Sequence, residues 1–439
     1  MQFTGKESGV ATLKEVLAAK IQVERQHAKE FVKEHGAKVI DQVTVEQVYG
    51  GMRGISCLLC DTSSVPADKG LIVRGKPIAD VANMLPEEIF WLLLTGELPD
   101  AAGLAALQAD LAKRSTVPDY VWNVIDAMPA DTHPMTLYNT AMLCLQNTSV
   151  FHERYSKGTL RKDDYWDPTF EDCLDIIARA PVISAGIYRK RFNKGSRVTE
   201  TSKAGLDWAA NYVRLLGISD PNGEFVKLMR LYMVLHCDHE NGNVSAMTTY
   251  TVNSALSDMY YAYSAGMNGL AGPLHGLANQ EGLNWILEAT TKFGGAPTHD
   301  QMREHATETL GAGKVIPGYG HGVLRVTDPR FECFYEFGKK HCPNDPVFKT
   351  VITVFETVPD VLMNIKKIKN PWPNVDAVSG SLLYHYGLTE TIYYTVLFGV
   401  SRALGVCAQN LWARALGMPL VRPKSVTSDW LECAVKSKA

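Results

Sequence analysis

The sequence lacks the dense cysteine framework of a small secreted domain. Its nine cysteines are odd in number and are scattered from Cys57 to Cys433, which predicts a reducing compartment. The Cys57-Leu58-Leu59-Cys60 pair has the spacing of a redox or zinc half-site. Because no second pair completes a four-ligand site and its middle residues are apolar, we expect no bound metal.

A strong net charge and a long apolar run are also missing. The chain of 439 residues carries a formal charge of −3, too little to attract nucleic acid or an anionic membrane. The best apolar stretch, residues 393–408, is interrupted by Arg402, so no membrane span is expected. The first residues resemble neither a secretory signal nor an organelle transit peptide. If the protein belongs in an organelle, we expect this sequence to be its processed form.

Nucleotide-binding motifs are absent as well. The segment Gly311-Ala312-Gly313-Lys314 resembles a phosphate loop, but Glu308 stands where the first glycine is needed and Val315 follows the lysine. No repeated alternation of strands and helices occurs, which excludes a parallel α/β sheet.

Helical periodicity dominates what is present. We expect helices from Leu13 to Gly36, from Pro86 to Gly96, and from Gly223 towards His239, because apolar spacing, capping residues and first-turn acids agree there. Further helices are expected near Pro118, Pro134 and Thr169. Strand patterns are confined to residues 37–75, where Val39, Ile40, Val43 and Val45, and later Leu71, Ile72 and Val73, predict short ribbons. The expected fold is therefore all-α, with minor β-ribbons near the N-terminus.

Three segments are rich in glycine and proline: residues 269–280, 317–321 and 370–376. Each presents one polar side chain, respectively His275, His321 and Asp376. These side chains are suited to acid–base chemistry on a carbonyl compound. Each also has a simpler interpretation. His275 has the position of a helix-entry residue, and Asp376 that of the N-cap of a helix beginning at Ala377.

Several arginines and histidines can likewise be interpreted either as parts of the protein structure or as ligand-binding groups. Arg402 lies inside an apolar helix and needs an anionic partner, either protein or ligand, which Arg330 and Arg422 could help to bind. His236 and His239 are expected to share one face at a helix end, where an anion or carbonyl ligand for His239 is favoured over zinc. The basic run 189–197 is expected to be a solvated surface.

The motifs GPLHGLANQE, PGYGH and NPWPNVD, with most of the chain from Leu13 to Ser425, resemble the citrate synthase family, specifically its eukaryotic mitochondrial type. The resemblance implies a homodimer of two-domain helical subunits. Residues 1–275 and 382–439 would form the large domain, and residues 276–381 a small mobile one. Active sites would be shared between the subunits.

The resemblance further implies an acyltransferase that condenses acetyl-CoA with oxaloacetate and hydrolyses citryl-CoA. Asp376 would be the base for the acetyl methyl, His275 the donor to the thioester oxygen and His321 the residue serving the oxaloacetate carbonyl. Four further residues would hold oxaloacetate, the last from the other subunit: His239, Arg330, Arg402 and Arg422. The residues expected at the CoA adenine are Leu274, Val315, Ile316, Gly318, Tyr319, Gly320 and Asn374.

The same resemblance implies no permanently bound cofactor, with CoA passing through as substrate and product, and a location in the mitochondrial matrix. The nearest alternative is a 2-methylcitrate synthase that prefers propionyl-CoA. A helical scaffold without activity is a second alternative, but the intact histidines, aspartate and arginines argue against it.

Overall fold

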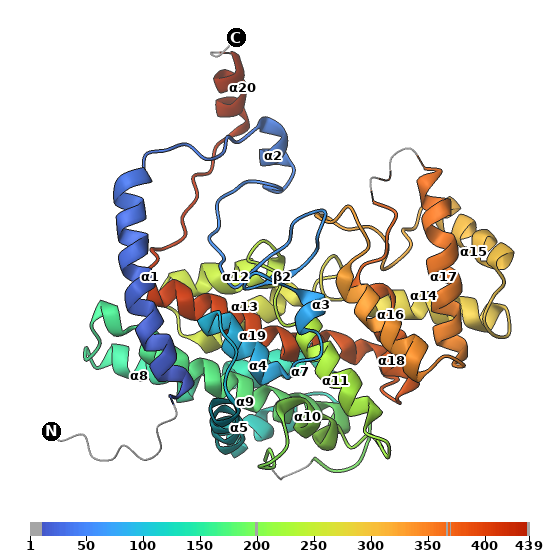
Figure 1. Ribbon diagram of the computed structural model, residues 1–439, viewed down its shortest axis with the longest axis horizontal. Helices are drawn as coiled ribbons and strands as arrows, with labels where there is room; N and C mark the ends of the chain where they lie inside the picture. Colours follow the sequence, from blue (N-terminus) through green and yellow to red (C-terminus); the bar gives the residue numbers. More distant parts are fainter. Residues whose placement is uncertain (1–10, 198–200, 366–367, 369, 437–439) are drawn as a thin grey trace.

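Helices form nearly all of the regular structure in the computed structural model, which describes residues 11–197, 201–365, 368 and 370–436 (Figure 1). The first ten residues, in which we expect no targeting signal, lie outside this range. The α-helices are α1 (Leu13–His35), α2 (Val45–Tyr49), α3 (Ile78–Val81), α4 (Pro86–Thr95), α5 (Ala101–Arg114), α6 (Asp119–Ala127), α7 (Pro134–Cys144), α8 (Val150–Ser156), α9 (Trp166–Arg191), α10 (Trp208–Leu216), α11 (Glu224–Leu235), α12 (Val244–Ser254), α13 (Met259–Leu270), α14 (Ala278–Lys292), α15 (His299–Gly311), α16 (Pro329–His341), α17 (Pro346–Met363), α18 (Ser379–His385), α19 (Tyr394–Ala415) and α20 (Ser428–Lys436). Short 3-10 turns are η1 (Leu145–Thr148), η2 (Lys162–Asp164), η3 (Val375–Ala377) and η4 (Thr391–Tyr393).

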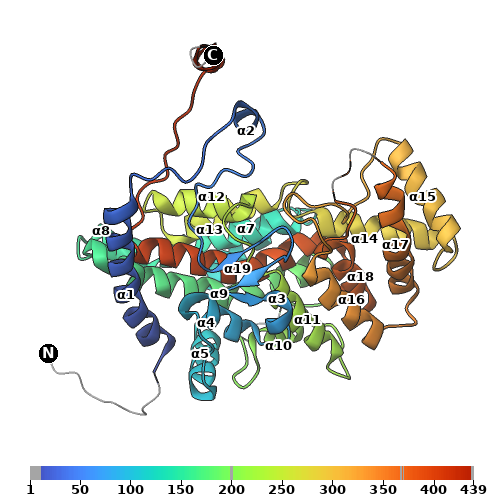
Figure 2. The same cartoon turned by 45° about the horizontal axis from the view of Figure 1, so that its top comes forward.

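The core is built around α19, which is buried along nearly its whole length. It packs against α4, α9, α12 and α13, and two views of the molecule show it running through the middle (Figures 1 and 2). Helices α14 to α18 lie together to one side of this centre. The stretch Thr391–Ala415 is long and apolar enough to cross a membrane, but 83% of its most apolar window is buried inside the molecule. The apolar side chains of this stretch therefore form part of the protein core.

The helix ends follow the local capping chemistry. Thr12 and Glu15 form a reciprocal capping box at the start of α1, and Gly36 follows its last residue. Helix α4 begins at Pro86 and ends before Gly96, which takes a left-handed φ of 75°. Both predicted helices are confirmed. The third, from Gly223, ends at Leu235 and so stops short of His239.

The strand prediction holds only in part. A small antiparallel sheet contains β1 (Ser63–Ser64), β2 (Ile72–Val73) and β3 (Lys76–Pro77) in that order, which confirms the ribbon at 71–73. The strand expected from Val39 to Val45 is wrong: residues 37–43 have no regular structure and Val45 begins α2. No neighbouring strand meets this segment within the described chain, so its backbone has no ladder partner.

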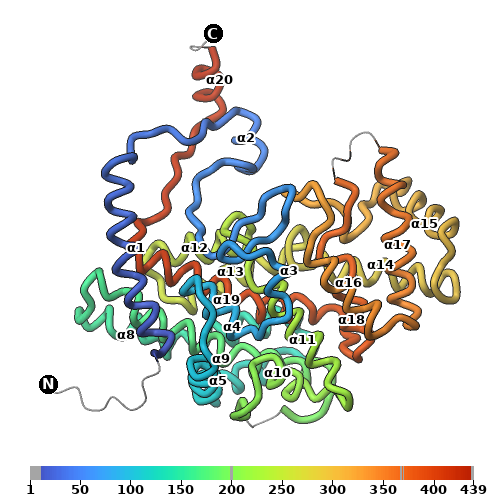
Figure 3. The backbone as a smooth tube through the Cα atoms, in the orientation of Figure 1, coloured from blue at the N-terminus to red at the C-terminus, as the bar shows by residue number. Residues whose placement is uncertain are grey.

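Two segments project from the body, as the backbone trace shows (Figure 3). One contains α2 and the loop before it, with Val39 79% and Ile40 83% exposed. The other follows α19 and ends in α20, which has no buried residue although Trp430 and Val435 lie on it. Much of this apolar surface stays exposed, although the Lys424 ammonium lies over the Trp430 ring. Such uncovered surface is typical of a protein–protein contact.

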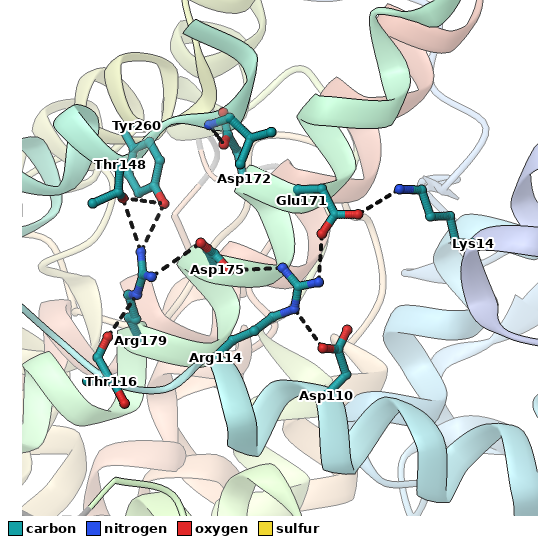
Figure 4. A network of polar contacts seen from close by, with 11 residues as sticks. Lys14, Asp110, Arg114, Thr116, Thr148, Glu171, Asp172, Asp175, Arg179 and Tyr260 are labelled. Carbon is teal, nitrogen blue, oxygen red and sulfur yellow. Dashed lines mark hydrogen bonds and ion pairs between the residues drawn. The ribbon is translucent and has the colours of Figure 1, made fainter. Parts of the chain in front are cut away.

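A chain of ion pairs fastens the outer helices to α9 (Figure 4). The guanidinium of Arg114 on α5 contacts Asp110, Glu171 and Asp175 at 2.8, 2.6 and 3.0 Å. Glu171 also accepts from Lys14 of α1 at 2.7 Å. Because these groups are only partly exposed and share their partners, they act as a network that sets the positions of α1 and α5.

A buried carboxyl on α4 makes stability depend on pH. Glu87 is 2% exposed and accepts from the Trp208 backbone N–H at 2.7 Å, and burial raises its pKa to about 7. Since the folded pKa lies above the unfolded one, this group's contribution is fully present below about pH 4.5 and is lost as pH rises towards 7.

We therefore expect Glu87→Gln, which keeps the acceptor for Trp208, to become progressively more stable than the unmodified chain between pH 5 and pH 8. A difference on the order of 3 kcal/mol should build up over that interval. Melting temperatures measured across this range test it. A difference between the two proteins that stays constant with pH would contradict the assignment.

Candidate active site

The loops that carry His321 and Asp376 are paired with each other through their backbones. The Asn374 N–H donates to the Gly318 carbonyl at 2.8 Å, and the Gly320 N–H donates to that of Trp372 at 3.1 Å. Gly318 is needed at this contact for two reasons. Its φ is +77°, and a Cβ there would lie 2.7 Å from the Cα of Ala377.

His321 is held as a neutral donor. Its Nδ1 accepts from the backbone N–H groups of Val323 and Leu324, at 2.9 and 3.0 Å. A backbone N–H can only donate, so the ring proton must be on Nε2. Burial, assisted by the positive charge of Arg330, lowers the His321 pKa to about 4. The imidazole of His239 faces it, with ring centroids 5.7 Å apart.

His275 is neutral with the opposite tautomer. Its Nε2 accepts from the Ser245 backbone N–H at 3.2 Å and lies 2.9 Å from the Ser245 hydroxyl, so Nδ1 carries the proton. Ser245 is the second residue of α12, where free N–H groups and the helix dipole favour an unprotonated ring nitrogen. Burial first, and then Arg402, lowers the His275 pKa to about 4.

His236 and His239 do not share a helical face, contrary to expectation, because α11 ends before them. His236 is fully buried and stacks on Tyr232, with ring centroids 4.0 Å apart. His239 lies in the following loop, and its buried Nε2 has no hydrogen-bond partner among the described residues. Burial and the charge of Arg330 lower its pKa well below the ordinary value. No cluster of three or more metal-ligating side chains occurs in the described part of the chain.

Arg402 is the buried cation of the site. It is 2% exposed, donates to the His236 carbonyl at 3.1 Å and to Asn243 Oδ1 at 3.2 Å, and lies over the ring of Phe398. No carboxylate of the described residues lies within 4.0 Å of it, so its charge is uncompensated at short range.

The other two predicted arginines differ from Arg402. Arg330, in the first turn of α16, is paired with Asp328 through its Nε and Nη2, the latter at 2.7 Å. Its Nη1 makes no hydrogen bond to any described residue. Arg422 is exposed on the segment after α19 and makes no described contact with the groups above. One subunit therefore does not bring all three arginines together.

Asp376 is not a helix cap. It lies inside η3, its backbone N–H donates to Asn374 Oδ1 at 2.9 Å, and α18 begins only at Ser379. Its carboxylate accepts no hydrogen bond from the described residues and is partly exposed. Burial raises the Asp376 pKa to about 6, against the opposing effect of Arg330. Helix α14 passes close by, because Gly282 has no side chain to meet the Asp376 carbonyl.

The predicted adenine residues lie around the paired loops. Leu274 is fully exposed and Val315 is 79% exposed, whereas Ile316 is buried. The side chain of Asn374 donates to the Gly320 carbonyl at 3.0 Å, so Gly318, Tyr319, Gly320 and Asn374 belong to one unit. The exposed apolar side chains of Leu274 and Val315 are available to a ligand.

Ion pairs hold the basic run 189–197 to neighbouring parts of the protein. Lys190 and Arg197 both pair with Asp126, and Lys194 pairs with Glu390.

Sequence reasoning missed Ser245 and Asn243, although the pattern Asn-Val-Ser before an apolar stretch is an N-cap signal that could have located the start of α12.

Comparison with known proteins adds to this geometry. Residues 51–424 match the family described as citrate synthase, C-terminal domain. The chain belongs to the citrate synthase family.

Its relatives include citrate synthase 4, mitochondrial, of Arabidopsis thaliana, 50% identical over 97% of this chain and 90% of that protein. The citrate synthase, mitochondrial, of Daucus carota is 48% identical over 96% and 90%. Among solved structures, the Pyrobaculum aerophilum citrate synthase has a TM-score of 0.75 at 26% identity, covering 89% of this chain and 95% of that one. A Thermoplasma acidophilum citrate synthase in ternary complex with carboxymethyl coenzyme A and oxaloacetate matches in fold, with a TM-score of 0.74 at 22% identity over 88% and 96%.

The tautomers can be tested directly. At pH 7, we expect nitrogen NMR of the protein labelled in its histidines to show His275 protonated at Nδ1 and His321 protonated at Nε2, both neutral. Because both pKa values are lowered to about 4, neither signal should titrate between pH 8 and pH 6. The variants His275→Gln and His321→Gln assign the signals. A titration centred near pH 6.5 would contradict the proposed electrostatics.

Proposed function

We propose that this chain condenses acetyl-CoA with oxaloacetate to form citryl-CoA and then hydrolyses it to citrate and CoA. The observation that carries the proposal is the arrangement of one carboxylate, two neutral imidazoles of opposite tautomer and a buried guanidinium without an anion. Each has a role in this reaction, and no metal or permanent cofactor is required.

Asp376 is the proposed base for the acetyl methyl group. A pKa of about 6 leaves it largely ionised at pH 7 to 8, yet makes it a stronger base than an ordinary aspartate. His275 would donate its Nδ1 proton in a hydrogen bond to the thioester oxygen as the enol forms. Because its Nε2 is fixed by α12, the donor is already aimed when charge develops.

Oxaloacetate would supply the anion that Arg402 lacks, and Arg330 would add its Nη1. Guanidinium groups bind carboxylates in fixed geometry, which orients the ketone. The Nε2–H of His321 would then donate to the ketone oxygen, with His239 beside it. The enol carbon attacks this carbonyl, and water finally cleaves the thioester.

The subunit would consist of a large domain, residues 1–275 and 382–439, and a small one, residues 276–381, that closes on oxaloacetate. His239 and Arg402 belong to the former and His321 and Asp376 to the latter, so the site would lie between the two domains and their relative movement would open and close it. CoA would bind at the edge of the small domain. The residues expected around its adenine are Leu274, Val315, Ile316, Gly318, Tyr319, Gly320 and Asn374, of which Leu274 and Val315 are exposed.

The chain would act as a homodimer, because α20 and the segment around Val39 leave apolar surface uncovered. Arg422 lies on the projecting C-terminal segment and would enter the partner's site.

The mitochondrial names of the relatives support a location in the mitochondrial matrix. They also favour acetyl-CoA over propionyl-CoA, and a comparison of kcat/KM for the two substrates tests this choice.

Replacing the base should abolish most of the activity. We expect Asp376→Asn to lower kcat by ~10²–10⁴-fold, the range of general-base effects, while oxaloacetate binds with nearly unchanged affinity. CoA release and calorimetry measure the two quantities. Asp360→Asn, a similar change on the exposed side of α17, should leave both unchanged. Retention of more than a few per cent of kcat by the Asp376 variant would remove Asp376 from the role of base.

If the active site is shared between subunits, two inactive variants should restore activity when they form a mixed dimer. Arg422→Ala and His275→Ala should each be nearly inactive alone. When they are refolded together in equal amounts, about half of the dimers are mixed, and each mixed dimer has one site with neither defect. Activity should return to about a quarter of the unmodified level. If mass spectrometry shows mixed dimers but no activity returns, Arg422 serves its own subunit.

A further inference from the structure

A second cavity lies between α3, α11 and α16. Its volume is about 560 Å³, within the range of small-molecule sites. None of the residues proposed for the chemistry lines it, but Pro329 at its rim is the neighbour of Arg330. One face of α16 borders the cavity with Cys333 and Phe337, and the first turn of the same helix carries Arg330.

Two lysines lie at one end of this cavity, and the Glu224 carboxylate lies there too, hydrogen-bonded to His341 and Tyr386. Glu224, the first residue of α11, contacts His341, the last residue of α16, at 3.1 Å, so the two helices run antiparallel along the cavity. Lys227 lies one turn into α11 and Lys340 directly precedes His341. Both ammonium groups therefore lie near the same end, and neither has a carboxylate within 4.0 Å among the described residues.

Negative charge is found at the other end. Glu332 lies in the first turn of α16, two turns before Lys340, and has no ion-pair partner in the described part of the chain. The remaining charges between the two ends are already paired inside the protein, Arg230 with Asp207 and Glu336 with Lys339.

The middle of the cavity is apolar. Ala82 and Leu231 are buried on the side of α3 and α11, and Phe337 lines the cavity from α16. Lys340 is eight positions after Glu332 along this helix, a rise of about 12 Å. A molecule of shorter length can reach both charged ends, because the lysine and glutamate side chains are flexible.

We propose that this cavity binds a chain-like zwitterion, whose carboxylate lies between Lys227 and Lys340, whose ammonium group pairs with Glu332 and whose methylene chain covers Leu231 and Phe337. Amino acids with the amino group at the far end of the chain belong to this class. Such a ligand holds α16 against α11 and thereby fixes Arg330 relative to the rest of the active site.

The consequence for catalysis rests on the proposed function. A ligand that fixes α16 relative to α11 changes the free energy of any movement of α16 that oxaloacetate binding requires, and the coupling between the two ligands must be reciprocal. We expect the affinity for oxaloacetate to change about fivefold or more when the cavity is filled.

Binding is tested by calorimetry on the full chain with γ-aminobutyrate and ε-aminocaproate, using caproate and hexylamine as ligands with one charge. The longer zwitterion should bind about tenfold more tightly than either single-charge analogue. Lys340→Glu and Glu332→Lys should each lose about that factor, whereas Lys349→Glu, on the exposed side of α17 and not lining the cavity, should keep the affinity. Equal affinities for zwitterion and single-charge ligands, or equal losses in all three variants, would overturn the proposal.

Coupling has two separate readouts. Hydrogen exchange should slow in α16 and α11 when ε-aminocaproate is added, without any substrate present. Absence of this protection overturns the proposed action through α16. The oxaloacetate titration is then repeated with the cavity filled, where an unchanged affinity also refutes the coupling. Failure of oxaloacetate to bind even to the free chain would instead count against the proposed function, since the zwitterion titration and the exchange data do not depend on it.

Discussion

Burial of the site around two guanidinium groups determines its electrostatic character. Arg330 exerts the larger charge effect on His239 and Asp376. On His275 this effect comes from Arg402, which has no carboxylate within 4.0 Å among the described residues. A guanidinium stays protonated even when burial lowers its pKa to about 10. Its field acts on the surrounding groups in opposite ways. It helps to keep His239 and His275 neutral, and it limits the rise in the pKa of Asp376 that burial causes. The same charge thus supports two neutral donors and one ionised base, and it leaves room for an anionic ligand.

Local backbone structure supplies the positions that this electrostatic arrangement needs. The N-terminus of α12 fixes the ring of His275, while two backbone N–H groups of its own loop fix His321. The loops of His321 and Asp376 form one unit because they share backbone hydrogen bonds and the close contact at Gly318. Backbone N–H groups, joined at His275 by the Ser245 hydroxyl, determine which ring nitrogen is protonated. This explains why the three site segments are rich in glycine and proline although the catalytic side chains are few.

Much of this could be predicted from the sequence, where the deciding interactions are local. The start of α1 at Thr12 and the end of α4 at Gly96 depend on neighbouring residues alone, and both predictions are confirmed. The strand expected around Val39 is wrong because a strand needs a partner, and apolar alternation does not show whether one exists. The cap expected at Asp376 is wrong because Asn374 takes that position two residues earlier. The contact between Ser245 and His275 could not be predicted, since it joins the start of α12 to the turn between α13 and α14, 30 positions along the chain.

The difference between the two buried arginines has a further consequence under the proposed function. Arg330 carries a counter-charge in Asp328 at 2.7 Å, whereas Arg402 has no carboxylate within 4.0 Å among the described residues. When oxaloacetate binds, its carboxylates neutralise Arg402 and add negative charge near Asp376. Both changes raise the pKa of Asp376 further, although Arg330 still opposes the rise, so the carboxylate becomes a stronger base when the first substrate is in place. Proton abstraction from acetyl-CoA is thereby favoured only after oxaloacetate is bound to receive the enol. An arrangement with every cation already paired could not link the strength of the base to the presence of the acceptor.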